Sequence, residues 1–367
     1  MTEQQIPYRP ETITPPGETI ADLLDERCMT QTELAQRMGR PVKTINEIVN
    51  GKAAIRPETA LQLERVFGVP ADYWLNHEAQ YRASLMRQDE ESHIERWYDW
   101  LDRMPIRELK RMGILPNVRN QGRNKNLLVR KLLDFFSVAT PDEWHTMYGN
   151  LQIAYRQSMP EQSNPFARAA WLRLGELEAE RCYTAPYNEP RFRAALQEIR
   201  GLTVLPPEEF EPQLRARCAE AGVVLALVPA IPRARVSGAA RWINNRPLIQ
   251  LSLLGKFNDR FWFTFYHEAG HILKHSRKVV FMDEWDDGEI SDMEAEADRF
   301  ATETLIPPGF EGELPNLKSK VVVQRFAQKV GVHPGIVVGR LQHDRIIEQS
   351  WMNDLKDRFA WREAANG

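Results

Sequence analysis

Residues 261–271 read Phe-Trp-Phe-Thr-Phe-Tyr-His-Glu-Ala-Gly-His, an aromatic run that ends in the string HExxH. Residues four apart lie on one face of a helix, so His267 and His271 can direct both imidazoles at one metal ion. Glu268 lies one step round the helix, close enough to act on a water held by that metal. The string predicts a metal-binding helix, and two histidines leave a third ligand to be found.

The third ligand is expected in residues 294–301, which read Glu-Ala-Glu-Ala-Asp-Arg-Phe-Ala and form a helix that two prolines end. Glu294 and Asp298 are four apart. Glu294 can therefore bind the metal, while Asp298 accepts a hydrogen bond from the ring nitrogen of a histidine ligand that does not face the metal. Glu296 points about 160° away from that face. We predict Glu294 as the ligand and Asp298 as the supporting carboxylate.

Two neutral imidazoles and one carboxylate suit Zn²⁺, and less favourably Mn²⁺ or Fe²⁺. Such a site lowers the pKa of water in the open position toward about 7. Glu268 is expected to take the proton of this water as it attacks a peptide carbonyl, and to pass it to the leaving amine. A metal site used only structurally is the alternative. His275 lies about 12 Å along the helix axis from His267, so we predict a structural histidine there.

Composition indicates a cytoplasmic protein of two or three domains. The chain has 367 residues, a formal net charge of −3 and three cysteines that are far apart in sequence. An odd number of scattered cysteines fits no disulfide or metal pattern and is typical of a reducing compartment. No signal peptide and no membrane-spanning run are expected. The net charge means that any contact with DNA must come from a local patch.

Residues 29–52, MTQTELAQRMGRPVKTINEIVNGK, predict two short helices joined by a turn at Gly39. Leu34 and Met38 lie on the apolar face of the first helix, and Ile45 and Ile48 on that of the second. This pattern describes a helix-turn-helix. Basic residues outnumber acidic ones five to one between 37 and 56, which favours phosphate contact. One module reads few base pairs, so we expect a homodimer on a palindrome; a helical bundle for protein docking is the alternative.

The middle of the chain reads as helices. Residues 78–94 predict a charged helix, and 95–185 are helical by pattern and rich in Trp and Tyr. Residues 119–125 form a basic segment, which is either a solvated loop or a nucleic-acid contact. Residues 159–165 look like a loop between helices. No chemistry is predicted for this region.

Strands are predicted only after residue 191. Two helices, 192–199 and 210–221, precede strands at 223–228, 235–243 and 248–253. Three strands followed by the HExxH helix describe a zincin-like α+β domain, in which an edge strand can bind an extended peptide. Asn258 and Asp259 are candidate N-caps of that helix. Residues 282–292 are acidic, and predict a solvated loop or a flap that selects basic substrates.

The tail repeats the N-terminal pattern. Ala327-Gln-Lys-Val-Gly331 followed by Val337 matches Ala35-Gln-Arg-Met-Gly39 followed by Ile45, at the same offsets. A second helix-turn-helix-like unit is predicted, for which contact with DNA is one role. Six basic residues keep the DNA role open: Lys318, Lys320, Arg325, Lys329, Arg340 and Arg345.

The predicted fold is multidomain and mainly α. A helix-turn-helix domain is expected over 1–88, a helical middle region over 89–190, the zincin-like α+β metallopeptidase domain over 191–312, and a helical, helix-turn-helix-like segment over 313–367.

The N-terminal stretch resembles the lambda-repressor-like (XRE) helix-turn-helix family, and its flanks, Pro16-Gly17-Glu18 and Trp74-Leu75, look more narrowly like the HigA-type antitoxins. The resemblance implies contact with double-stranded operator DNA. The residues that it places near base edges are Val42, Lys43, Asn46 and Glu47, and those that it places on the DNA backbone are Gln31, Arg40, Thr44 and Lys52.

Residues 257–308 resemble the ImmA/IrrE metallopeptidases, on His267–His271, Glu294–Ala301 and Leu305-Ile306-Pro307. The resemblance implies His267, His271 and Glu294 as ligands and Glu268 as base. It also implies that the second helix-turn-helix-like unit packs against the peptidase, as the alternative to contact with DNA. The expected function is a DNA-binding regulator with a zinc-dependent endopeptidase domain, which autoregulates its operon and cleaves a repressor or a toxin-associated protein in a toxin–antitoxin, stress or phage response. The alternative is a non-enzymatic HigA-type antitoxin that represses its promoter and neutralises a HigB-like toxin, with an inactive metal site.

Overall fold

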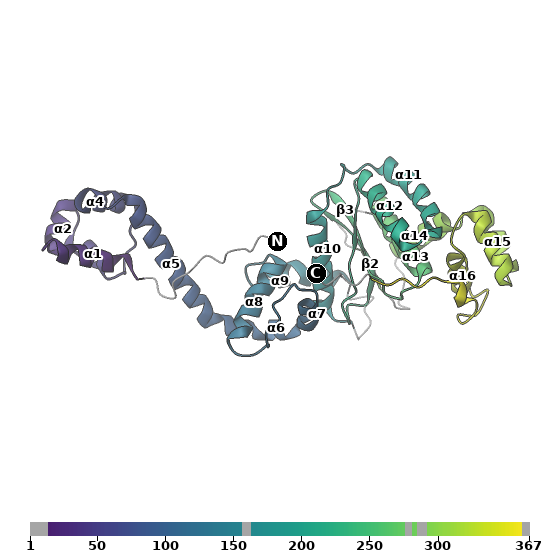
Figure 1. Cartoon of the computed structure of the whole chain (residues 1–367), viewed down its shortest axis with the longest axis horizontal. Helices are drawn as coiled ribbons and strands as arrows, with labels where there is room; N and C mark the ends of the chain where they lie inside the picture. Colours follow the sequence, from purple (N-terminus) through teal and green to yellow (C-terminus); the bar gives the residue numbers. More distant parts are fainter. Residues whose placement is uncertain (1–13, 156–162, 276–280, 285–291, 362–367) are drawn as a thin grey trace. The chain divides into compact units, whose positions relative to one another are not determined.

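The computed structural model describes residues 14–155, 163–275, 281–284 and 292–361 (Figure 1). The chain divides into two compact units, Met1–Tyr98 and Asp99–Gly367, and each has its own buried apolar core. In the described ranges, no helix has both the length and the apolar composition needed to cross a bilayer. The predicted multidomain, mainly α fold is confirmed, with a helix-turn-helix at the N-terminus and a small sheet near the C-terminus.

The first unit is helical throughout. Its elements are α1 (Pro16–Glu26), α2 (Gln31–Met38), α3 (Val42–Val49), α4 (Pro57–Phe67), α5 (Ala71–His93) and η1 (Ile94–Trp97). The core of the helix-turn-helix is built from the predicted apolar faces, with Leu34, Ile45 and Ile48 at most 4% exposed, and Trp74 of α5 closes it.

Two local signals fix the helix-turn-helix. Thr30 caps α2 by accepting a hydrogen bond from the Glu33 amide at 3.1 Å. Gly39 ends the helix with φ +66°, a left-handed conformation that favours glycine. The Arg40 amide then donates to the Ala35 carbonyl at 2.9 Å and closes the turn before α3. The small side chain of Ala35, 1% exposed, lets the helices approach closely.

The second unit contains the remaining helices and the sheet. Its helices are α6 (Tyr98–Arg103, at the boundary), α7 (Ile106–Arg111), α8 (Arg123–Phe136), α9 (Pro141–Tyr155), α10 (Pro165–Arg181), α11 (Glu189–Arg200), η2 (Gly201–Val204), α12 (Pro207–Glu220), α13 (Asn258–Lys274), α14 (Asp292–Leu305), η3 (Pro308–Asn316), α15 (Lys320–Val330), α16 (Pro334–His343) and η4 (Asn353–Leu355). Its strands are β1 (Val224–Leu227), β2 (Val236–Ile243), β3 (Arg246–Leu251) and β4 (Phe281–Glu284).

The sheet has the order β1-β3-β2-β4. β1 and β3 are parallel, while β2 is antiparallel to both of its neighbours. β2 and β3 form a hairpin whose turn residues, Asn244 and Asn245, have φ +49° and +62°. Two consecutive positive φ angles are the geometry of a type I′ turn, which asparagine tolerates well.

Helices cover both faces of the sheet (Figure 1). Side chains alternate along β2. Gly238 faces α13, where a Cβ on it would lie 2.5 Å from Thr264, and Arg241 faces α10, where its guanidinium donates to the Leu172 carbonyl. The HExxH helix therefore packs on one face of the sheet, and the last helix of the middle region packs on the other.

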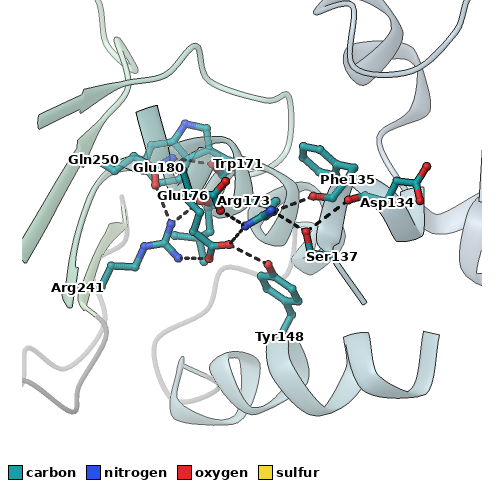
Figure 2. Close-up of polar contacts among 11 residues, drawn as sticks. Asp134, Phe135, Ser137, Tyr148, Trp171, Arg173, Glu176, Glu180, Arg241 and Gln250 are labelled. Carbon is teal, nitrogen blue, oxygen red and sulfur yellow. Dashed lines mark hydrogen bonds and ion pairs between the residues drawn. The ribbon is translucent and has the colours of Figure 1, made fainter. Parts of the chain in front are cut away.

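A buried polar network joins the middle region to the sheet (Figure 2). Glu176 of α10 is its centre and accepts from Arg173 at 2.8 Å, from Arg241 of β2 at 2.8 Å and from the Tyr148 hydroxyl at 3.2 Å. Arg173 also donates to the Phe135 carbonyl at the end of α8. Two arginines that are at most 7% exposed thus lie against one carboxylate. The middle region is an integral part of the second unit.

The tail folds as a second pair of helices with the predicted turn. Gly331 ends α15 with φ +81°, as Gly39 ends α2. The second helix differs between the two pairs, because most of α16 is buried, from Gly335 to Val338 and at Leu341 and Gln342. A recognition helix must expose its side chains to reach base edges. The structure therefore favours packing over DNA reading for α16.

Three predictions about the second unit need correction or lie outside the described residues. Residues 282–284, expected in a loop, belong to strand β4 beside β2, while 285–291 of the acidic segment lie outside the described residues. Most of the predicted loop 159–165 also lies outside them, and α10 begins at Pro165. Asn258 and Asp259 are not N-caps of α13, because Phe257 holds that position.

Candidate metal centre

Three potential ligand atoms converge between α13 and α14. The Nε2 atoms of His267 and His271 lie 2.9 Å apart, and Glu294 Oε2 lies 3.1 Å from the first and 3.5 Å from the second. Ligands of a tetrahedral zinc ion, at about 2.0–2.2 Å from it, are separated by about 3.3 Å. The spacing of the three donors therefore fits one metal ion of this size.

The protonation states also fit a metal. Burial lowers the pKa of His271 to about 4, against the raising effect of its hydrogen bond to Glu294. Burial would raise the pKa of Glu294, but hydrogen bonds with His267 and His271 outweigh it and hold that pKa at about 2. At neutral pH the cluster thus offers a neutral imidazole at His271 and an ionised carboxylate, the forms that bind metals.

The Nδ1 atom of each imidazole, on the far side of the ring from the metal point, has a partner that fixes the orientation of the ring. Asp298 Oδ1 lies 2.8 Å from His267 Nδ1, and His275 Nδ1 lies 2.9 Å from His271 Nδ1. With Nδ1 engaged, each Nε2 is directed at the shared point beside Glu294. Partners of this kind set the tautomer and the ring angle of metal-binding histidines.

Glu296 lies away from the cluster. Its carboxylate is 3.4 Å from Lys274 Nζ and 3.4 Å from His275 Nε2. The sequence offered Glu294 and Glu296 as ligands, and the structure brings only Glu294 to both histidines.

Glycines let other elements approach the HExxH helix closely. A Cβ on Gly270 would lie 3.2 Å from Ala297 Cα, so the glycine sets the spacing of α13 and α14. A Cβ on Gly238 would lie 2.5 Å from Glu268 Oε1. Glu268 is fully buried, and its carboxylate lies against the backbone of β2 at the position where a side chain is missing.

A cavity of about 300 Å³ lies along α13, one turn before the histidines. Phe263 and Thr264 line it from α13, Thr302 lines it from α14, and Gly339 from α16. The Phe263 ring lies 6.3 Å from the His267 ring. The tail thus forms part of the wall of a cavity that borders the candidate site.

Sequence reasoning missed the contacts that anchor the start of α13. Asn258 is within 2.7 Å of His333 Nδ1, and Asp259 forms a 2.6 Å ion pair with Lys356 in which both side chains are at most 9% exposed. The two candidate capping residues are used to bind the tail. No local pattern around Lys356 indicated this pairing.

In the first unit, α3 exposes the side chains that were predicted to meet DNA. Val42 is 44% exposed and the Lys43 side chain 86%. Asn46 Nδ2 lies 3.3 Å from Gln31 Oε1, which links α3 to the first turn of α2. Arg40 instead turns to α4, where it contacts Gln62 and pairs with Glu58 at 3.3 Å.

Thr44 and Glu47 are partly buried, and Lys52 is exposed. Glu47 lies 3.9 Å from Lys43 Nζ on the outer side of α3. Of the eight residues predicted to contact DNA, Arg40 is therefore the one most firmly held by the protein itself.

Two family models match the chain. Residues 20–74 match a helix-turn-helix family, and residues 237–342 match the IrrE N-terminal-like domain. The second match covers β2, the HExxH helix, α14 and most of the tail.

Curated relatives match short parts of the chain. An uncharacterized HTH-type transcriptional regulator, YddM of Escherichia coli (strain K12), is 38% identical over 61 residues, which are 17% of this chain and 65% of the relative. Virulence-associated protein A of Dichelobacter nodosus is 43% identical over 54 residues, 14% of this chain and 53% of the relative. Virulence-associated protein I of the same organism is 35% identical over 78 residues, 21% of this chain and 72% of the relative. The chain thus spans less than two thirds of the first two relatives.

Solved structures also match less than a quarter of the chain. A HigA-family addiction module antidote protein from Coxiella burnetii is 28% identical, with 23% of this chain and 92% of that chain covered and a TM-score of 0.21. Antitoxin HigA of Pseudomonas aeruginosa, solved with the higBA promoter, is 26% identical, with 23% and 94% covered and a TM-score of 0.22. The two family models and the relative that is 35% identical show that the chain belongs to the XRE-type helix-turn-helix family through its N-terminal unit, and that it carries an IrrE N-terminal-like peptidase domain in the same polypeptide.

Proposed function

We propose that this chain is a DNA-binding regulator whose second unit is a zinc-dependent endopeptidase. The observation that carries the proposal is the convergence of His267, His271 and Glu294 on one point, on the helix that also holds the buried Glu268. A structural metal site needs no carboxylate beside its ligands, whereas peptide hydrolysis needs a general base there.

His267, His271 and Glu294 would hold the metal, which supplies Lewis-acid polarisation of the scissile carbonyl and a lowered pKa for water. Glu268 takes the proton from the attacking water and delivers it to the leaving amine. Its burial against Gly238 restricts the carboxylate to a narrow range of positions. Asp298 and His275 keep the two imidazole rings oriented.

The sheet supports binding of an extended substrate. β4 is the terminal strand on the side of β2, and the outer backbone groups of a terminal strand can pair with a peptide. The substrate class that follows is a protein with an accessible extended segment, such as a repressor or a toxin-associated protein.

Substitution of Glu268 tests the proteolytic part of the proposal. Glu268→Gln keeps the shape of the side chain and removes its basicity, so metal content should remain and cleavage should fall at least a hundredfold. The assay compares the abundance of the neighbouring genes' products, and of the whole proteome, in cells with the wild-type protein or the Glu268→Gln variant. Glu303→Gln, on the metal-site helix α14, is the matched control.

If no protein differs between the two strains, the proteolytic proposal fails. The chain is then better described as a non-enzymatic antitoxin of HigA type that represses its promoter and masks a toxin.

For the first unit we propose operator binding as a homodimer. Val42, Lys43, Asn46 and Glu47 of α3 would face base edges, and Gln31, Thr44 and Lys52 would contact phosphates, with Arg40 joining them only if it leaves Glu58. The exposure of Lys43 and Asn46 supports this arrangement.

The DNA proposal is tested with the promoter of the chain's own gene. Asn46→Ala should weaken binding by about 1–3 kcal/mol, the usual value of a good base contact, in a fluorescence anisotropy titration at fixed salt. Arg65→Ala, an exposed change on α4, is the control. Equal affinity of the Asn46→Ala and Arg65→Ala variants would contradict the placement of α3 in the major groove.

A further inference from the structure

The segment from Arg103 to Lys131 has a charge opposite to that of the chain as a whole. It contains nine lysines and arginines and one acidic residue, Glu108, for a net charge of +8, while the whole chain has −3. The segment covers α7, the loop that follows it, and most of α8. It lies outside both matched family regions.

Two lysines of this segment, Lys110 and Lys125, hold it together. Lys110 Nζ of α7 donates to the Val118 carbonyl in the loop. Lys125 of α8 pairs with Asp102 of α6 at 3.1 Å, and Asn120 in the loop donates to the same carboxylate. These contacts bind the loop to α7 and α6, and bind α8 to α6. The loop is therefore a folded part of the surface.

Five arginines of the segment are exposed. Arg103 lies over the Phe166 ring at 5.9 Å, and the other four are Arg107, Arg111, Arg119 and Arg123. Arg107 and Arg111 are four apart on α7 and so share one face. Within the described part of the chain, none of the four forms an ion pair with a carboxylate. We call these four residues the arginine surface.

We propose that the arginine surface binds the phosphate backbone of duplex DNA, as a second DNA contact of the same chain. Exposed amides lie between the arginines, at Asn117 and Gln121, and arginine together with asparagine and glutamine is the usual composition of phosphate contacts. The surface offers little to an acidic protein, because tight protein interfaces need buried apolar anchors. Between residues 99 and 140, Leu127 alone among the large apolar side chains is exposed.

Such a contact would be independent of sequence. The helix-turn-helix would select the operator, and the arginine surface would add affinity that depends strongly on salt. The peptidase unit would then be held on DNA by its own contacts. This inference does not require that α3 reads bases, since the arginines act on any duplex.

The experiment measures the salt dependence of duplex binding by the full-length protein. A fluorescein-labelled duplex of random sequence is titrated between 50 and 200 mM NaCl, in a Lys43→Ala, Asn46→Ala background that disables the helix-turn-helix. Each lost phosphate contact should reduce the slope of log affinity against log salt by about 0.9. Replacing all four arginines by glutamine should therefore reduce the slope by about 3–4 and weaken binding at least tenfold at low salt.

The matched control replaces four other exposed arginines of the same unit, Arg181, Arg191, Arg193 and Arg233, and causes the same change in net charge. If both sets reduce the slope equally, or if the background protein does not bind the duplex, the proposal is wrong. Should the fourfold variant fail to fold by circular dichroism, the pairs Arg107/Arg111 and Arg119/Arg123 are tested separately, each with an expected change of about 1.8. If the Lys43→Ala, Asn46→Ala background loses operator binding, but the fourfold arginine variant keeps the salt slope of that background on the random duplex, the helix-turn-helix proposal stands and this one is wrong.

Discussion

Glu176 is the residue whose replacement should most clearly test how the middle region is joined to the peptidase. Glu176→Gln removes the charge that faces two buried guanidiniums, those of Arg173 and Arg241, whose side chains are 9% and 5% exposed. Breaking a buried ion pair from one side costs about 3–5 kcal/mol, because the remaining charge has lost its compensation.

The expected loss is smaller than that full range. Glutamine keeps one acceptor oxygen, Glu176 is 20% exposed, and Glu180 still lies 3.1 Å from Arg173. We therefore expect the free energy of unfolding of the second unit to fall by about 2–3 kcal/mol. The assay is urea unfolding followed by tryptophan fluorescence, to which Trp171 beside this network contributes as one of ten tryptophans.

Glu189→Gln is the control, because Glu189 also pairs with an arginine, Arg193, but this pair of residues four apart on α11 is exposed. Its side chains are 49% and 46% exposed, and pairs of this kind contribute about 0.3–0.5 kcal/mol. A loss at Glu176 no larger than the loss at Glu189 would refute the argument that this network stabilises the joint between α10 and β2.

Three further outcomes are expected. Gly238→Ala should leave bound metal unchanged and lower cleavage at least tenfold, because the new Cβ would lie 2.5 Å from Glu268 Oε1. Gly309→Ala has open space around the new Cβ and should change neither metal content nor cleavage. Equal cleavage by both variants would contradict the placement of Glu268. Metal-free protein should lose stability as pH falls from about 6.5 to about 4, since burial lowers the pKa of His271 in the folded state and the unfolded state binds the proton first. The urea midpoint of His271→Ala should therefore change less across this pH range than that of the wild type. An identical pH dependence would argue against the lowered pKa of His271. Cys28 is exposed and should react first with a thiol reagent. Burial raises the pKa of Cys218 to about 12 and should protect this thiol until the protein unfolds. A fast phase of thiol labelling that persists in Cys28→Ser would show that another thiol is accessible.

The sequence predicted best where a feature depends on neighbouring residues. The turn at Gly39 follows from a left-handed C-cap, and its repetition at Gly331 follows from the same local signal. The spacing of His267 and His271 on one helix face is likewise local. Glu294 could be preferred to Glu296 because helical geometry alone separates the two carboxylates by face.

Features that depend on distant partners could not be predicted. Asn258 and Asp259 have the composition of helix caps, yet they bind His333 and Lys356, which are far along the chain. β4 lies in an acidic stretch whose pattern indicated a loop, and its strand conformation comes from pairing with β2. Tertiary context determines strand formation in such short segments.

The burial of α16 also depends on contacts with residues far away in the sequence. Its sequence repeats the pattern of α3, but Gly335 and Gly339 allow α16 to pack closely against the start of α13. A Cβ on Gly339, for example, would lie only 2.6 Å from Asp259 Oδ2. The same local pattern thus serves an exposed helix in one unit and a buried helix in the other.

The central claim is that His267, His271 and Glu294 together hold one metal ion, and the metal content of purified full-length protein tests it most directly. Wild-type protein and Glu268→Gln, prepared without chelators and analysed by mass spectrometry, should each contain close to one equivalent of zinc, because Glu268 is not a ligand. Glu294→Ala should contain little, and Glu296→Ala should match the wild type, since Glu296 pairs with Lys274 away from the cluster. A wild-type protein with less than about half an equivalent of any divalent metal, or a Glu294→Ala protein as fully loaded as the wild type, would contradict the account.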